Sequence, residues 1–176
     1  MKRSIESMAL PLAGRWQRVA LSLAFCAASL AGGLALSAPV EPLPGGEIIA
    51  ISMEKDCFGC STGERLHLRR DGLASLALTG KARHRTQDET SLGAIGSDDF
   101  EALARLTLAQ GFFAMQDSYE DPQIRDGAWT LIKVECSGGT SKQVFRRERE
   151  GPTALNVIES AMAELRGRIV FERKHP

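Results

Sequence analysis

Three cysteines offer the clearest chemistry in this sequence. Cys57 and Cys60 form a Cys-x-x-Cys pair, and Cys136 follows nearly 80 residues later. In a thioredoxin-like protein the first cysteine of such a pair begins a helix, whose dipole lowers the pKa of the thiol. Here Ser61 and a Thr-Gly pair come next, which predicts a turn followed by a strand. The pattern therefore gives little support to a disulfide reductase.

Metal and haem chemistry are also weakly supported. A zinc site would need two ligands beyond the Cys-x-x-Cys pair, and only Cys136, His67 and His84 are at hand, without a second metal-spaced pair. Covalent haem attachment needs a histidine directly after the second cysteine, where Ser61 stands. We expect neither a metal nor a cofactor.

A structural disulfide is the remaining interpretation, because an exported domain meets an oxidising compartment. A bridge from Cys57 or Cys60 to Cys136 would contribute roughly 4–5 kcal/mol in the chain-entropy model, whereas a Cys57–Cys60 bridge would contribute roughly 2 kcal/mol. The long bridge is favoured if the fold brings its sulfur atoms within reach. All three cysteines are disulfide candidates, and one of them would stay free.

The first 38 residues predict export. Four basic residues precede an uncharged, Leu- and Ala-rich run from Val19 to Ala38, which is the layout of a secretory signal. The run is also long enough to span a bilayer as an uncleaved anchor. A third alternative is a lipoprotein, because residues 23–26 have the outline of a lipobox ending at Cys26. We expect a periplasmic domain or one anchored in the cell envelope, touching the membrane through this segment if it is uncleaved.

The charge of the chain excludes one class of partner. The sequence has 176 residues, with 22 basic and 22 acidic side chains. The first 38 residues carry four basic residues and one acid, so the remainder has a net charge of −3. A weakly acidic body lacks the electrostatic footprint of a nucleic-acid-binding protein. It also argues against docking on anionic lipid by overall charge alone.

The remaining residues predict one domain with an α+β fold. A Pro- and Gly-rich linker over 39–46 precedes a single domain over 47–176. Ser97 resembles an N-cap, Gly111 a helix-ending glycine, Pro152 a first helical residue and Gly167 the end of the second helix. We expect an antiparallel sheet of hairpins with two helices packed on one face. The expected strands are 48–53, 65–69, 73–79, 90–95, 128–136 and 142–146, with a further edge strand over 168–172.

Several short motifs, spread from Ile48 to Leu165, resemble a known family. They are Cys57-Phe58-Gly59 with a second cysteine, Arg70-Asp71-Gly72, Gly111-Phe112-Phe113 with Tyr119, Asp126 with Thr130, and Pro152 with Leu155. Together they are similar to a bacterial family of exported proteins known as domain of unknown function 6438, whose opening motif is Cys-Phe-Gly-x-Cys-Pro. The resemblance implies an exported, lipoprotein-like or anchored α+β domain. It implies no activity, substrate or site.

Basic residues suggest a binding face. Arg65, His67 and Arg69 alternate along one expected strand, and Arg85 follows in the same basic stretch. They would form either a surface for an anionic envelope component or a solvated strand face. An acidic segment around Asp117 to Asp126 does not have EF-hand spacing, and Trp129 is expected to pack against a helix.

No catalytic set is evident in the sequence. We therefore expect an exported, non-enzymatic domain that binds or scaffolds an unknown envelope component. The alternative is a thiol-dependent redox or metal-binding protein that uses Cys57, Cys60 and Cys136.

Overall fold

The computed structural model describes residues 45–124 and 126–174. The N-terminal basic and apolar run, Cys26 and most of the linker therefore lie outside the described residues. Within the described part, no helix is both long enough and apolar enough to cross a membrane.

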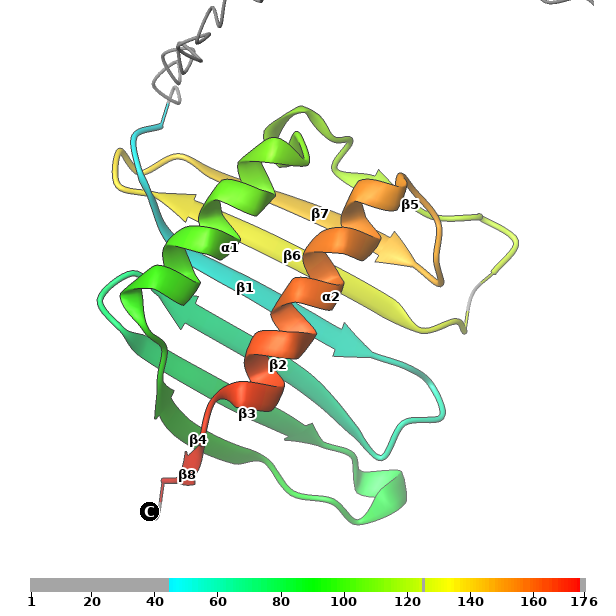
Figure 1. The fold of residues 1–176 in the computed structure, drawn as a ribbon. Helices are drawn as coiled ribbons and strands as arrows, with labels where there is room; N and C mark the ends of the chain where they lie inside the picture. The colour runs from blue at the N-terminus through cyan, green and yellow to red at the C-terminus, as the bar shows by residue number, and fades with distance from the viewer. Residues whose placement is uncertain (1–44, 125, 175–176) are drawn as a thin grey trace, which may run out of the picture. The chain divides into compact units, whose positions relative to one another are not determined.

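Eight strands and two α-helices make up the domain (Figure 1), with two short 3₁₀ helices between them. The helices are α1 (Ser97–Ala109) and α2 (Thr153–Arg168), and the 3₁₀ helices are Ala82–His84 and Phe112–Ala114. The strands are β1 (Ile48–Asp56), β2 (Thr62–Arg69), β3 (Leu73–Gly80), β4 (Glu89–Ala94), β5 (Ser118–Tyr119), β6 (Trp129–Cys136), β7 (Ser141–Arg147) and β8 (Glu172–Arg173).

All eight strands form one sheet in the order β5-β7-β6-β1-β2-β3-β4-β8. Every neighbouring pair is antiparallel except β5 and β7, which are parallel. The first strand is therefore central, between β2 and β6, because the chain returns across the sheet after α1 to add β6 and β7 beside it. A mostly antiparallel sheet with two helices confirms the predicted α+β class.

Strand alternation decides which side chains are buried. Along β6, Thr130, Ile132, Val134 and Cys136 are buried while the residues between them are partly exposed, as expected when successive side chains point to opposite faces. The buried strand residues join residues of both helices in one core, including Phe100 of α1 and Ile158 of α2. Both helices are seen in front of the sheet in Figure 1.

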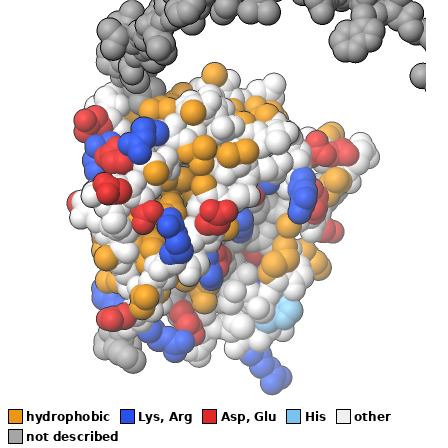
Figure 2. All heavy atoms as spheres, in the orientation of Figure 1, with side chains coloured by type: hydrophobic (Ala, Val, Ile, Leu, Met, Phe, Trp, Pro, Cys, Tyr) orange, Lys and Arg blue, Asp and Glu red, His pale blue; other side chains and the backbone are white. Residues whose placement is uncertain are grey.

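Viewed from the same side, charged side chains of both signs are intermixed over the surface, with hydrophobic side chains between them (Figure 2). This distribution agrees with the small net charge of the chain, and it shows no single-sign field on the helix side.

The ends of the helices differ from the sequence prediction by one or two residues. The N-cap of α1 is Gly96 rather than Ser97, and the N-cap of α2 is Pro152, which we predicted one position later in the helix. Neither cap residue makes a side-chain hydrogen bond to the helix. At its other end α2 continues through Gly167, because the burial of Leu165 and the core contact of Ile169 hold the last turn against the sheet.

Two local predictions were wrong. Phe112 and Phe113, expected on an extended piece, lie in a 3₁₀ turn that begins after Gly111, whose φ of +69° turns the chain sharply. Trp129, expected against a helix, instead lies beside the ring of Phe145 on β7, with the ring centres 6.0 Å apart. The register explains this, because Thr130 occupies the buried position and Trp129 faces the other way.

Candidate functional site

The strand positions that point away from the core form a surface that we call the polar face. It spans four adjacent strands, and its members are partly or fully exposed apart from the small Ala50. The polar face consists of Ala50, Ser52 and Glu54 on β1, Arg65, His67 and Arg69 on β2, Leu131, Lys133 and Glu135 on β6, and Gln143 and Phe145 on β7.

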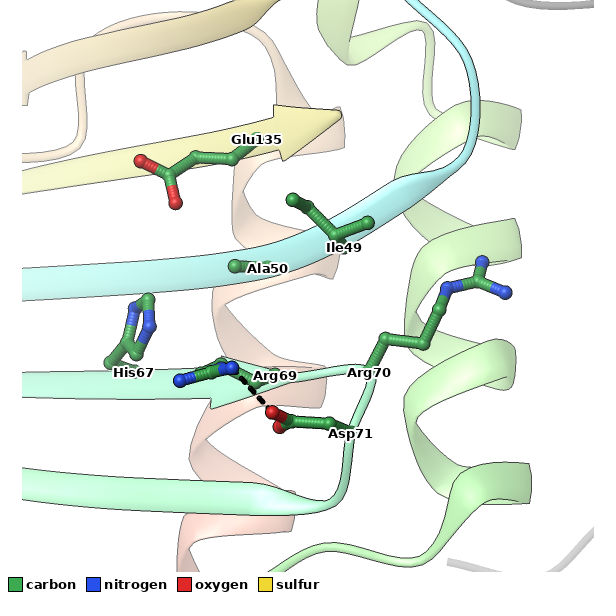
Figure 3. Close-up of a pocket in the computed structure, with 7 residues that line it drawn as sticks. All are labelled: Ile49, Ala50, His67, Arg69, Arg70, Asp71 and Glu135. Carbon is green, nitrogen blue, oxygen red and sulfur yellow. Dashed lines mark hydrogen bonds and ion pairs between the residues drawn. The ribbon is translucent and has the colours of Figure 1, made fainter. Parts of the chain in front are cut away.

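Small residues in the central strand hollow out this face. Ala50 pairs with Glu135 of β6 and Arg69 of β2, and Ser52 pairs with His67. Because β1 contributes short side chains between longer ones, a hollow of ≈ 540 Å³ opens above Ala50. Figure 3 shows His67 and Glu135 on the strands either side of β1, with Ala50 between them.

A second hollow of ≈ 310 Å³ adjoins the first and shares His67 and Glu135 with it. Its other walls are Leu131 and polar side chains of β1, β2 and β6. Ile49, which is 40 % exposed, lines the far end of the first hollow. Together the two hollows run along the face, with Ile49 and Leu131 as the large apolar side chains among charged and polar ones.

The cations of the polar face are balanced by acids of the same sheet. Arg65 donates to Glu54 through Nε at 2.8 Å, Arg69 pairs with Asp71, and Lys133 pairs with Glu135. Arg65, His67 and Arg69 share this face as the alternation of β2 predicted. The sequence did not reveal that each arginine has an acidic partner, because the acids come from β1 and from the turn after β2.

Burial and neighbouring charges lower the pKa values of His67 and Glu135. Burial lowers the pKa of His67 from its ordinary value of 6.5, and Arg69, Arg65 and Lys133 lower it further, while Glu135 opposes the shift. The hydrogen bond from Lys133 lowers the pKa of Glu135. His67 is therefore held in its neutral form, and Glu135 is held ionised, at neutral pH.

Arg85 lies apart from the three basic residues of β2. It follows the 3₁₀ helix Ala82–His84 in the connection between β3 and β4, with a left-handed backbone (φ 56°). The acidic segment is likewise dispersed, since Asp117 pairs with Lys142 and Asp121 caps the backbone N–H of Gln123. No group of three or more potential metal ligands occurs among residues 45–124 and 126–174.

The cysteines are joined locally. Cys57 and Cys60 form a disulfide, and Cys136 is a buried free thiol whose pKa burial raises. The long bridge favoured by loop entropy is not formed. Cys136 pairs with Ile48 at the start of β1, whereas Cys57 follows the end of that strand, roughly 30 Å away at about 3.4 Å per residue. The disulfide itself confirms a disulfide-bonded domain.

An ion pair beneath α2 was missed by the sequence reasoning. The Nε of Arg146 on β7 lies 2.6 Å from Oε1 of Glu159 on α2, and both side chains are close to fully buried at 6 % and 12 % exposed. The two atoms attract as charges without an aligned hydrogen bond, and a second nitrogen of Arg146 donates to Asn156 at 2.8 Å. The sequence did contain a signal for this pair. Arg146 is two residues from the buried Val144 on the same strand, so strand alternation directs its side chain into the core.

This pair borders a third hollow, of ≈ 460 Å³, beside the disulfide. Lys55 approaches the other carboxylate oxygen of Glu159 at 3.9 Å, and Glu64 receives two hydrogen bonds from Arg166 at 2.7–2.8 Å. These three pairs attach α2 to the sheet, because one member of each lies on α2. The arrangement is that of a structural ion-pair network.

Comparisons with known proteins do not assign this chain to a family. No family model and no curated protein match this chain. The resemblance to domain of unknown function 6438 therefore stays a prediction from the motifs.

Proposed function

We propose that this chain is an exported, non-enzymatic domain that binds another envelope component through its polar face. The proposal takes the sheet as built of hairpins with both helices packed on one face, which leaves the polar face to the partner. The observation that carries it is the pair of adjoining hollows above Ala50 and Ser52, walled by charges of both signs.

The character of the face favours a polypeptide as the partner. Its arginines and lysine are matched by Glu54, Asp71 and Glu135, so a polyanion would have to displace these carboxylates. A protein segment that carries both charges and apolar groups would not. The partly exposed Leu131 and Phe145, with Trp129 beside Phe145 at the edge of the face, supply the aromatic and apolar area that protein interfaces use.

Exchanging the two charges of one pair tests the proposal. In the variant with Glu54→Arg and Arg65→Glu the pair within the domain is retained, so the free energy of unfolding should stay within about 1 kcal/mol of wild type. The pattern of charge offered to the partner is reversed, and capture of the partner from envelope extracts should be lost. The captured component is identified by mass spectrometry and rebound in purified form.

The matched control exchanges the pair formed by Glu89 and Arg173, on β4 and β8, which lies away from the polar face. That variant should capture the same component as wild type. If the exchange at Glu54 and Arg65 leaves capture of the purified component unchanged, the polar face is not the binding surface.

The alternative is a thiol-dependent protein. One observation supports a narrower version of this hypothesis, in which only Cys57 and Cys60 take part. Cys57, Cys60 and Trp129 line a hollow of ≈ 460 Å³, through which a reductant could approach the disulfide. Cys136 is remote from both. Replacing both Cys57 and Cys60 by serine separates the two functions, because the binding proposal predicts loss of stability without loss of partner capture at low temperature.

A further inference from the structure

Two loops are fastened together at one end of the sheet. The Nζ of Lys81 donates to the carbonyl oxygen of Cys57 at 2.6 Å, and Oγ1 of Thr86 donates to the carbonyl oxygen of Ser61 at 2.6 Å. The Cys57–Cys60 disulfide closes the first loop on itself. We call residues 57–63 and 81–87 the loop tip.

An aromatic ring stands at this tip. Phe58 is 65 % exposed, and no other aromatic side chain of the described residues is exposed as far. The guanidinium of Arg83 lies over the ring, 4.4 Å from its centre. Since the disulfide and the contact with Lys81 hold the loop, little further ordering is needed for Phe58 to enter an apolar layer.

The charge of the loop tip is of one sign. It contains Lys81, Arg83 and Arg85 and no acidic residue. Lys81 is paired with Asp56, but neither Arg83 nor Arg85 forms an ion pair with a described residue. The chain after residue 38 has a net charge of −3, so the cations of the tip stand against an acidic body. Asp56 and Asp126 lie at the border of the tip, in the hollow beside Phe58 and Arg83, so the local excess of positive charge rests on Arg83 and Arg85.

We propose that the loop tip docks on the anionic surface of a lipid bilayer. Phe58 enters the boundary between headgroups and acyl chains, and Arg83 and Arg85 pair with lipid phosphates. A protein partner fits the tip less well, because specific protein interfaces use about 20–30 residues a side, whereas the two loops of the tip together contain 14 residues. A hollow of ≈ 290 Å³ does lie beside Phe58 and Arg83, but the ring itself projects into solvent. This docking site is separate from the polar face and does not depend on it.

Co-sedimentation with vesicles tests the proposal. Residues 40–176 form a compact unit, so this part, with its disulfide intact, is mixed with phosphatidylcholine vesicles with and without phosphatidylglycerol. Binding is expected only to the anionic vesicles, and it should weaken at high salt. Arg83→Gln or Arg85→Gln should lower the partition coefficient about fivefold each. Phe58→Ala should lower it about tenfold, whereas Phe58→Trp should preserve it.

The matched control is Arg105→Gln, which removes an exposed arginine from α1 and should leave the partition coefficient unchanged. All five variants alter exposed side chains, so their unfolding should match wild type. Equal binding to neutral vesicles, equal loss in Arg105→Gln, or no binding at all would overturn the proposal. Displacement by soluble glycerol phosphate, or Phe58-independent binding to polyglutamate, would assign the cations to a free anion or an acidic protein and overturn it as well.

Discussion

At the scale of single residues, the pair formed by Arg146 and Glu159 joins β7 to α2 in a nearly dry environment. Removing Glu159 leaves the buried Arg146 with only the neutral Asn156 as a partner, and removing Arg146 leaves the buried Glu159 with only Lys55, 3.9 Å away. We predict that Arg146→Ala or Glu159→Ala lowers the free energy of unfolding by about 3–5 kcal/mol, as measured by urea denaturation.

A double variant separates the free-energy cost of burying the two charges from the attraction between them. Arg146→Met combined with Glu159→Leu removes both charges and fills similar space, so it should be much less destabilised than either single variant, or more stable than wild type. A double variant whose loss equals the sum of the single losses would contradict this account, because the two residues would then act independently.

His67 predicts a pH dependence. Its pKa is lowered in the folded domain, so the unfolded chain binds a proton first as the pH falls. The contribution to stability is complete above the ordinary pKa of 6.5, declines as the pH falls through it, and is fully lost below the folded pKa. An NMR titration of the His67 ring should give a midpoint below 6.5.

Glu135 provides the matched test of the cause. It is the only group among those named that raises the pKa of His67, so Glu135→Gln should move the midpoint further down. A midpoint at or above 6.5 in wild type, or an upward shift in the variant, would show that burial and the neighbouring cations do not control this histidine.

At the scale of elements, the missing side chain of Gly93 on β4 lets the segment after α2 pack closely against this strand. A Cβ at this position would lie 2.7 Å from both the carbonyl oxygen of Val170 and a methyl of Ile169, closer than atoms in contact allow. We predict that Gly93→Val displaces the segment 169–174 from β4, with faster hydrogen exchange there. Exchange in β6 should be unchanged, and unchanged protection of 169–174 would contradict the prediction.

The strands and helices could be predicted where the apolar residues of the sequence recur with a single clear period, of two for a strand or 3.6 for a helix. The alternation of residues 65–69 and the helical stripe through Leu155, Ile158 and Met162 correspond to β2 and α2. The 3₁₀ turn at Phe112 was missed because a run of apolar residues carries no period. The strand β5 was missed because its two residues are defined only by pairing with β7.

The candidate site was only partly predictable for the same reason. Alternation placed Arg65, His67 and Arg69 on one face, but their partners depend on the register of β1 and β6, which no local pattern specifies. Likewise, loop entropy ranked the disulfides without knowing that β1 separates Cys57 from Cys136. The sequence predicted which residues share one strand face, but it did not predict contacts between segments that are distant in the chain.

At the scale of the whole molecule, β1 separates the entry of the chain from the loop tip. The domain is entered at Ile48, and Cys57 follows the other end of this nine-residue strand. The polar face extends between these ends, so a tethered domain could hold a partner along the sheet. The proposed function depends on that face being the one that meets a partner in the envelope.

Site-specific photo-crosslinking in cells tests that claim most directly. A photoreactive residue is placed at Leu131 or Gln143 of the polar face, and at Ser160, an exposed position of α2, as the matched control. We predict the same crosslinked envelope protein from Leu131 and Gln143 and none from Ser160. Crosslinks from Ser160 alone, or from none of the three positions, would contradict the proposed binding function.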